Sequence, residues 1–251
     1  MLKHILFFLL LVPGFCRAQT ITIAAAADLQ FVFQDVTVRF QQDTGRQVKV
    51  IYGSSGDFFA QIQNGGPFDL FFSADIAYPQ KLEAAGLTEP GTLYEYATGK
   101  IVLLAPKGSP LDLSRGPSVL LDPQVKKIAI ANPEHAPYGR AAVAALKHEK
   151  LYDQVAAKFV LGENISQTAT FVVSGSADVG IVALSLALAP SMQPKATYAA
   201  IPDEDYPPIR QAAVVVRTSQ QKETARQFLA FLKKPDIVSL LEKYGFVVPK
   251  S

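Results

Sequence analysis

The hydrophobic pattern of the chain alternates between short apolar runs and longer amphipathic segments. The apolar runs predict β-strands over residues 21–23, 48–52, 68–72, 101–105, 127–130, 179–182 and 211–216. Apolar residues at three- and four-residue spacing predict helices over residues 29–43, 58–63, 76–85, 117–121, 138–147, 165–173, 218–232 and 235–245. Because strand and helix alternate, we expect an α/β fold with mostly parallel sheets that helices cover on both faces.

The pattern restarts at Lys100, which predicts two α/β units of similar plan. A Pro-rich stretch over residues 201–208 ends the second unit, and the strand at 211–216 follows it. Open α/β sheets bind ligands beyond the carboxyl ends of their strands, so two such sheets facing each other would form a cleft. Several small, polar turns would then line that cleft.

One such turn is Gly53-Ser54-Ser55-Gly56, between a predicted strand and a predicted helix. Small residues there let the backbone approach a ligand, and the free N–H groups and dipole of the helix favour an anion. Capping of the helix by Ser54 or Ser55 explains the same residues without a ligand. The two interpretations are compatible, because one serine can both cap its helix and face an anion.

The N-terminus has the features of a cleaved secretory signal. A short basic start precedes the apolar run 5–12, which is too short to span a bilayer, and the small residue Ala18 follows. A lipoprotein signal ending before Cys16 is the alternative, but Phe15 stands where such signals have a small residue. We expect cleavage before Gln19.

The mature chain would be electrically neutral. The full chain of 251 residues has 24 basic and 22 acidic residues, and loss of Lys3 and Arg17 leaves 22 of each. The one Cys also lies in the signal, so we expect no disulfide and no thiol chemistry. A neutral chain with no Trp and no basic run is not expected to bind nucleic acid or a membrane surface.

No catalytic constellation stands out in the mature chain. His135 lies in a Pro-bracketed loop and His148 at the polar end of a helix, where loop bracing and solvation are the favoured roles. The chain has no nucleophile-elbow pattern, no phosphate-loop Lys and no glycine-rich dinucleotide fingerprint. Arg140 lies one turn into its helix, so a bidentate clamp for a carboxylate is not expected. We expect a binding protein without a cofactor and not an enzyme.

Segments in a fixed order resemble a known family. They are Ile21–Leu29, Gly53–Gly56, Pro67–Asp75, Asn132–Gly139, Val179–Val182 and Tyr244–Phe246. Together they are similar to the periplasmic molybdate-binding proteins of ABC importers, over nearly the whole mature chain. The resemblance implies a two-lobed type II periplasmic binding protein, in which each lobe is a mostly parallel sheet flanked by helices. The implied divisions are 1–18 for the signal peptide, 19–98 plus 212–251 for the first lobe and 99–211 for the second.

The resemblance also implies a function. Members of the family hold molybdate or tungstate in the cleft through neutral hydrogen-bond donors, without a salt bridge. The oxyanion would bring the molybdenum, so no separate metal site is implied. A monomer in the periplasm would deliver the anion to the permease of an ABC importer in the membrane. The alternative is a receptor for another oxyanion, such as phosphate or sulfate.

Family positions carry over to particular residues of this chain. Ser55 matches a serine of the family, and we expect its hydroxyl and N–H to donate to the anion. Tyr138 and Ile165 stand where members donate a backbone N–H from alanine and valine. Ala183 replaces a ligand tyrosine, and the hypothesis is that the Tyr138 hydroxyl supplies the missing donor. The full expected ligand set is Ala27, Asp28, Ser54, Ser55, Tyr138 and Ile165.

Asp28 departs from the family, whose best-known members have a serine there. A deprotonated oxyanion offers only acceptors, so an ionised carboxylate facing it would repel it. Three hypotheses follow. The side chain turns away and caps the helix 29–43 while its N–H faces the ligand; or Asp28 or the ligand carries a proton; or Asp28 coordinates the metal centre of the oxyanion directly.

Overall fold

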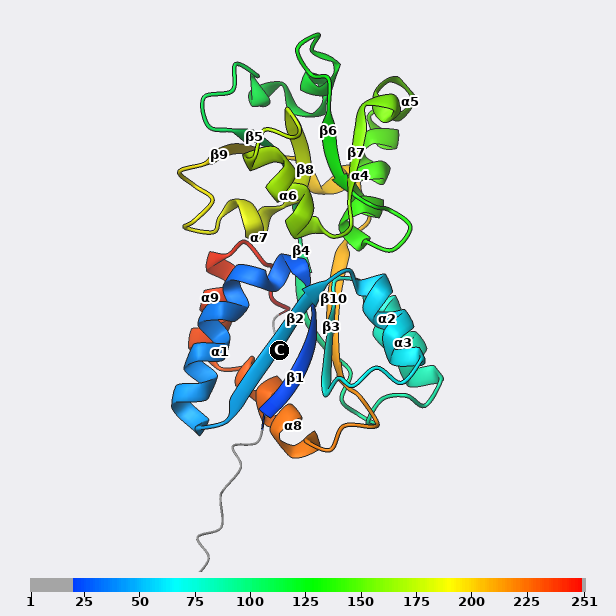
Figure 1. Ribbon diagram of the computed structural model, residues 1–251, viewed down its shortest axis with the longest axis vertical. Coiled ribbons are helices and arrows are strands. Elements are labelled where there is room, and N and C mark those ends of the chain that lie inside the picture. Colours follow the sequence, from blue (N-terminus) through cyan, green and yellow to red (C-terminus); the bar gives the residue numbers. More distant parts are fainter. Residues whose placement is uncertain (1–19, 250–251) are drawn as a thin grey trace, which may run out of the picture.

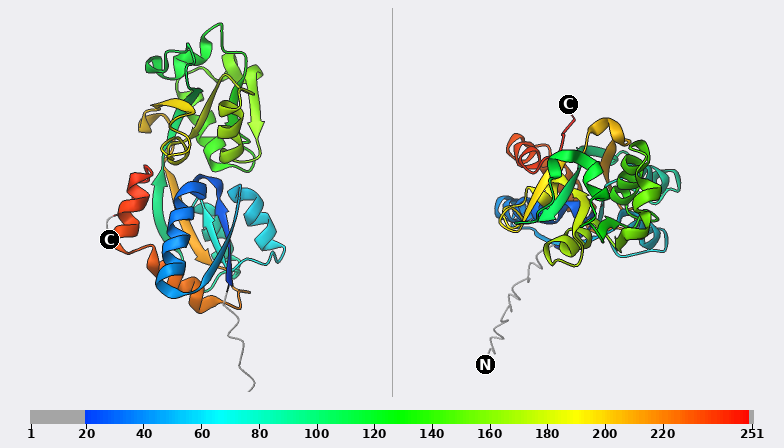
Figure 2. Two further views of the ribbon diagram at one scale, coloured as in Figure 1. Left: turned by 60° about the vertical axis from the view of Figure 1, so that its left-hand side comes forward. Right: turned by 90° about the horizontal axis from the view of Figure 1, so that it is seen from above.

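Two α/β lobes make up the protein. The computed structural model describes residues 20–249, so the predicted signal peptide lies outside the described residues. Two five-stranded sheets, each with helices on both faces, are stacked along the long axis (Figures 1 and 2). The predicted two-lobed α/β fold is thereby confirmed. None of the helices between residues 20 and 249 has the length and apolar character that crossing a membrane requires.

The first sheet has the strand order β2-β1-β3-β10-β4. Its strands are β1 (Thr20–Ala26), β2 (Gln47–Gly53), β3 (Leu70–Ser73), β4 (Tyr94–Gly99) and β10 (Ile209–Val215). β10 pairs antiparallel with both of its neighbours, while β1 pairs parallel with β2 and β3. The helices of this lobe are α1 (Gln30–Thr44), α2 (Ser55–Gln63), α3 (Ala77–Ala84), α8 (Lys222–Phe231) and α9 (Pro235–Lys243).

Helices cover both faces of this sheet because its central strands are apolar on both sides. Ile23 belongs to the buried cluster that includes Phe33 of α1 and Phe228 of α8, whose ring centroids are 5.9 Å apart. The next residue, Ala24, points the other way and packs with Phe58 of α2. Alternate side chains of a strand point to opposite faces, so the apolar run at β1 serves both layers.

The second sheet has the strand order β7-β6-β8-β5-β9. Its strands are β5 (Ile101–Pro106), β6 (Ile128–Ala131), β7 (Phe159–Gly162), β8 (Val179–Ala183) and β9 (Ala196–Ala200). β5 is antiparallel to both neighbours, as β10 is in the first sheet. The helices of this lobe are α4 (Pro137–His148), α5 (Tyr152–Val155), α6 (Ile165–Val173) and α7 (Leu184–Ala187).

Two connections join the lobes. Lys100 alone separates β4 from β5, and residues 201–208 link β9 to β10 (Figure 1). The lobe boundaries implied by the resemblance, after residues 98 and 211, fall inside β4 and β10. Gly99 ends β4 at a crowded point, where an added Cβ would overlap the hydroxyl of Tyr138. Only glycine therefore fits this close approach of the connection to the second lobe.

Several predicted elements differ from those observed. The strands β4, β7 and β9 were not predicted. These strands mix polar or small residues with apolar ones, and pairing with β10, β6 and β5 holds them in the sheets. The helix expected at 117–121 belongs to a 3-10 stretch, Leu113–Leu121, broken at Gly116 with a φ of 62°.

Candidate functional site

Turns from both lobes meet around one small cavity. Strand-to-helix turns of the first lobe reach it after β1, β2 and β3, and the starts of α4 and α6 reach it from the second lobe. We call it the interlobe cavity; its volume is about 10 Å³ in this closed arrangement of the lobes. Its lining is Ala26, Ala27, Asp28, Gly53, Ser54, Ser55, Ala74, Ala136, Pro137, Tyr138 and Ile165.

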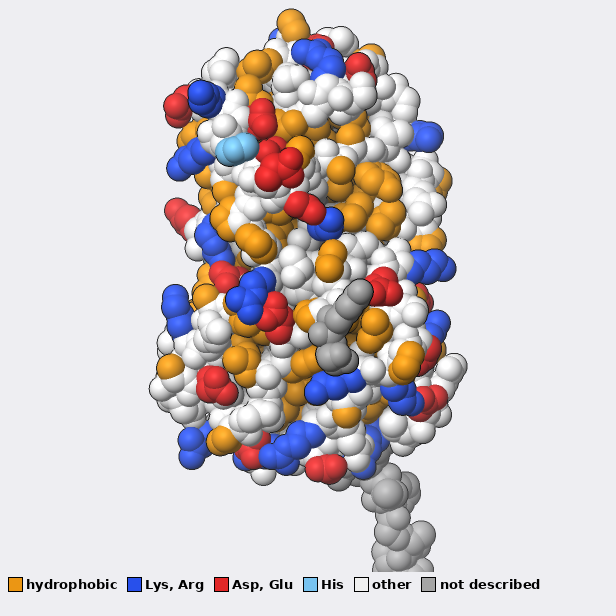
Figure 3. Space-filling view, turned by 180° about the vertical axis from the view of Figure 1, so that it is seen from behind, with side chains coloured by type: hydrophobic (Ala, Val, Ile, Leu, Met, Phe, Trp, Pro, Cys, Tyr) orange, Lys and Arg blue, Asp and Glu red, His pale blue; other side chains and the backbone are white. Residues whose placement is uncertain are grey.

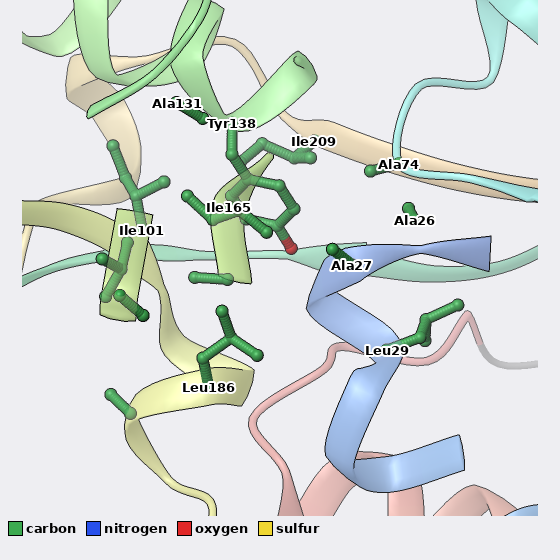
Figure 4. Packing of buried hydrophobic residues seen from close by; sticks show 14 of the residues in the cluster. Ala26, Ala27, Leu29, Ala74, Ile101, Ala131, Tyr138, Ile165, Leu186 and Ile209 are labelled. Atoms are coloured by element: carbon green, nitrogen blue, oxygen red, sulfur yellow. The ribbon is translucent and has the colours of Figure 1, made fainter. Parts of the chain in front are cut away.

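All six residues expected to bind the ligand line this cavity. They come from four parts of the chain, two in the first lobe and two in the second, as far apart as Ala27 and Ile165. Figure 4 shows the Tyr138 ring descending from α4 between Ile165 and Ala27. The structure thus brings the predicted set together, and ligand binding by it remains a prediction.

Ser55 is the first residue of α2 and is completely buried. Its Oγ accepts the backbone N–H of Ala74 at 2.9 Å. Since a hydroxyl donates one hydrogen bond as well as accepting others, the Ser55 proton stays available to a group in the cavity. Ser54 stands at the N-cap position, but its side chain makes no capping hydrogen bond.

Ser54 instead joins the two lobes. Its Oγ donates to the carbonyl oxygen of His135 at 2.7 Å, and the Gly56 N–H donates to the same oxygen at 2.9 Å. His135 Nδ1 lies 3.0 Å from Ser54 Oγ and 3.5 Å from Asp57 Oδ2. An added Cβ at Gly56 would lie 2.6 Å from the His135 oxygen, so the approach requires glycine. The loop of His135 is therefore braced against the first lobe.

Asp28 does not cap a helix. The structure shows no side-chain capping bond at the start of either the 3-10 turn Ala27–Leu29 or α1, so the capping hypothesis is wrong. The carboxyl is 1% exposed, and its Oδ2 accepts Tyr138 Oη at 2.8 Å and Gln211 Nε2 at 2.7 Å. These partners lie far along the chain, so tertiary contacts fix the carboxyl.

Burial dominates the electrostatics of Asp28. Loss of hydration raises the pKa of its carboxyl from 3.8 to about 6, although the hydrogen bonds from Gln211 and Tyr138 and the nearby backbone N–H groups of Asp28 and Leu29 act to lower it. The second oxygen, Oδ1, is buried without a hydrogen-bond partner among the described residues. Asp28, one of the lining residues, therefore carries an unsatisfied polar atom.

Tyr138 uses its hydroxyl within the protein. The proton is donated to Asp28, and the oxygen accepts Gln211 Nε2 at 2.9 Å. Burial and the nearby Asp28 raise the pKa of Tyr138 well above its usual value, so the phenol stays neutral. Ala183 ends β8 in the core and does not line the cavity. Replacement of a ligand tyrosine at Ala183 by Tyr138 stays a hypothesis.

Ile165 begins α6 beside the cavity. The N-cap residue Asn164 accepts the N–H groups of Ser166 and Gln167 through its side chain, each at 3.0 Å. Neither bond uses the N–H of Ile165, which belongs to the first turn and has no intrahelical acceptor. The start of α6 therefore presents a backbone donor and the positive end of its dipole to this region.

Sequence reasoning missed Gln211 and Tyr96. Gln211 is fully buried in β10, and its Oε1 accepts the Tyr96 hydroxyl at 2.7 Å. The pairing of β10 with β4 is irregular between Gln211 and Ala212, which marks a bulge. A glutamine at the head of the apolar run 211–216 was the available signal, because a buried amide needs partners.

Further polar contacts close the lobes outside the cavity. Arg140 Nη2 lies 2.6 Å from Asp75 Oδ2, and Arg140 Nη1 lies 3.3 Å from the Tyr78 hydroxyl. Ser166 of α6 donates to the side chain of Gln30 in α1. Arg140 is thus paired across the cleft and does not enter the lining of the interlobe cavity.

The possible metal ligands lie elsewhere. Within residues 20–249, one group of side chains could hold an ion: His148, Glu149 and Asp205, at the far end of α4 from the cavity. His148 Nδ1 is 3.0 Å from Asp205 Oδ1, so His148 has a partner where solvation was expected. In Figure 3, acidic side chains gather beside the histidine in the upper half of this face, and both signs of charge are mixed over the rest of it.

Two lobes, each built on a mixed sheet, that close over a small cavity are the arrangement of a solute-binding protein. The chain belongs to the family of bacterial extracellular solute-binding proteins, whose model matches residues 21–247. It is 36% identical to the molybdate-binding protein ModA of Azotobacter vinelandii, over 92% of each chain. It is 34% identical to ModA of Rhodobacter capsulatus, over 92% of this chain and 89% of that protein.

A solved structure gives the same result. The periplasmic molybdate-binding protein of Azotobacter vinelandii matches with a TM-score of 0.86 and 33% identity. The match covers 92% of this chain and all of that one. The family resemblance inferred from the ordered segments is thereby confirmed.

Proposed function

We propose that this protein captures molybdate, and also tungstate, in the interlobe cavity and delivers it to an ABC importer. The observation that carries the proposal is the chemistry of the lining. Ser55 offers a hydroxyl proton, and Ile165 offers a first-turn N–H. Within residues 20–249, the lining of the cavity contains no Lys, Arg or His. The similar proteins are molybdate-binding proteins, which supports molybdate as the ligand.

Such a lining suits a tetrahedral oxyanion. The anion presents only acceptors, and neutral donors at the starts of α2 and α6 satisfy them without a buried counter-ion. The helix dipoles add favourable potential at the same points. Fixed donors in a cavity of fixed size would favour molybdate and tungstate over the smaller sulfate.

Closure of the two lobes would complete the binding shell. Ser55 belongs to the first lobe, and Tyr138 and Ile165 to the second, so an open cleft would offer only part of the set. The Ser54–His135 and Arg140–Asp75 contacts would hold the closed form. That form would present surfaces of both lobes to the membrane permease, and opening would release the anion.

One observation favours a second candidate, a receptor for hydrogen phosphate. The Oδ1 atom of Asp28 has no partner, and an ionised Asp28 would accept a proton carried by the ligand. Molybdate and sulfate bring no such proton at neutral pH. A protein that binds phosphate would therefore rank the anions in a different order.

Isothermal titration calorimetry on the mature, monomeric chain tests the proposal. Molybdate and tungstate are expected to bind at least a hundredfold more tightly than sulfate and phosphate. A preference for phosphate would replace the proposal with the second candidate. Mass spectrometry of the protein from the periplasm is expected to find Gln19 as the N-terminal residue, whereas a lipid-modified Cys16 would contradict cleavage by the ordinary secretory route.

A further inference from the structure

The two oxygens of the Asp28 carboxyl have different surroundings. Oδ2 accepts hydrogen bonds from Tyr138 Oη and Gln211 Nε2, while Oδ1 is buried and has no partner. In a neutral carboxylic acid, one oxygen carries the proton and the other accepts. The two donors at Oδ2 assign the accepting role to that atom, which leaves Oδ1 to carry the proton.

Few charges act on this carboxyl. The groups that face it most closely are the phenols of Tyr138 and Tyr96, which are buried and neutral. The α6 and α7 helices, which pack against the turn of Asp28, contain no ionisable side chain. Among residues 20–249, no Lys, Arg or His donates a hydrogen bond to the Asp28 carboxyl.

The remaining neighbours of this turn carry charges that are exposed, as Lys49 is, or paired with other side chains. On β2 the ionisable residues are Lys49 and Tyr52, and the phenol of Tyr52 has its pKa raised to about 12 by burial. On α1, Asp35 accepts the Tyr244 hydroxyl. The other charged residues of α1 pair away from the cavity: Arg39 with Asp236 and Asp43 with Lys234. Asp28 thus has no counter-charge that would keep it ionised beside an anion.

We propose that Asp28 binds the oxyanion as a neutral acid, with its Oδ1–H donating to the ligand, so that binding takes up one proton. This inference rests on the proposed function. Atoms and charges balance simply: a proton from solvent joins the carboxylate, and no bond of the anion is made or broken. The orphaned atom then gains a partner, and the like-charge contact between carboxylate and dianion is removed.

Proton uptake would make the affinity fall as pH rises. Burial already places the pKa of Asp28 near 6 before any anion is present. Above that pH, each further unit is expected to weaken binding by about tenfold, because a proton must first be bound. The acid also selects ligands: Oδ1–H needs an acceptor, so a fully deprotonated oxyanion fits it better than one that carries its own proton.

Calorimetry with molybdate in two buffers of different ionisation enthalpy measures the proton directly. At about pH 8, the wild-type protein is expected to take up close to one proton per anion. The Asp28→Asn variant is expected to take up none and to bind with an affinity that does not change between about pH 7 and 9. Asparagine keeps an acceptor for Tyr138 and Gln211 and places an NH2 donor where the acid would place its proton.

His135→Gln is the matched control, because His135 is a titratable side chain at the contact between the lobes that does not touch Asp28. It is expected to keep the wild-type pH dependence. Binding by the wild-type protein without proton uptake would overturn the inference alone, and so would an Asp28→Asn variant that keeps the pH slope. Failure of every oxyanion to bind would overturn the proposed function together with it. The number of protons that the wild-type protein takes up per anion tests the inference even if Asp28→Asn does not fold.

Discussion

Tyr138 and Asp28, 110 residues apart in the chain, share a hydrogen bond of 2.8 Å across the boundary between the lobes. Tyr138 lies in the first turn of α4, and Asp28 in the turn that follows β1. Gln211 touches both, so the second connection between the lobes ends in the same network. The candidate ligand site and the second connection between the lobes therefore share a set of buried polar groups.

Removal of the Tyr138 hydroxyl is expected to weaken oxyanion binding. Tyr138→Phe deletes a donor to Asp28 and a contact between the lobes, at a cost of about 1–3 kcal/mol, or about 5- to 150-fold in Kd. Calorimetry with molybdate measures the change. Tyr96→Phe is the control, because its hydroxyl contacts Gln211 and no residue of the second lobe. A larger loss of affinity in Tyr96→Phe than in Tyr138→Phe would contradict a role of the Tyr138 hydroxyl in binding.

Loss of the Ser55 hydroxyl is expected to cost more than loss of the Ser54 hydroxyl. Ser55→Ala removes a donor to a charged ligand, which corresponds to about 1.5–3 kcal/mol, or about 10- to 150-fold in Kd. Ser54→Ala removes a neutral contact with His135 and is expected to weaken binding by about tenfold or less. Molybdate affinities of the two variants, measured side by side, make the comparison. Equal losses would mean that Ser55 does not donate to the anion.

Asp28 is expected to destabilise the ligand-free fold at neutral pH. The pKa of its carboxyl is raised in the folded state from 3.8 to about 6, so its favourable contribution is full below about pH 4 and is lost as pH rises through 6. This shift in pKa corresponds to about 3 kcal/mol of the free energy of unfolding, lost between low and neutral pH.

Urea unfolding of the wild type and of Asp28→Asn between about pH 4 and 7 tests this expectation. Other carboxyls titrate in both proteins, so the difference between the two isolates Asp28. The variant is expected to gain stability relative to the wild type as pH rises. A difference that does not change with pH would show that the folded state does not shift this carboxyl.

The Arg140–Asp75 pair is expected to favour the closed form. Arg140→Gln removes an ion pair that is partly exposed, with an expected cost of about 1 kcal/mol or less, or up to about fivefold in Kd. Small-angle scattering is expected to show a larger radius of gyration for the ligand-free variant. Arg210→Gln is the control, because its partner Glu95 lies in the same lobe. If both variants change shape equally, the pair does not act on closure.

The local pattern predicted much of this architecture. Apolar runs located most of the central strands, and small residues marked the turns after β1 and β2 that line the cavity. Those signals are local, since they depend on periodicity and on backbone freedom at Gly and Ser. The strands β4 and β9 escaped prediction because their partners, β10 and β5, are supplied by other parts of the chain.

The side chain of Asp28 shows the limit of local reasoning. An aspartate before an amphipathic helix is a good N-cap candidate on sequence alone. Donors from Tyr138 and Gln211, which lie 110 and 183 residues away, fix the carboxyl elsewhere. Only the packing of the two lobes brings those groups together, so neither the network nor the raised pKa of Asp28 could be predicted from the sequence.

The position of bound molybdenum tests whether the interlobe cavity is the anion-binding site. Crystals of the mature protein grown with molybdate would locate the metal by its anomalous scattering. We expect one peak in the interlobe cavity, with oxygens of the anion within hydrogen-bonding distance of Ser55 Oγ and the Ile165 N–H. A peak at the His148, Glu149 and Asp205 group, or no peak within the cavity, would contradict this expectation.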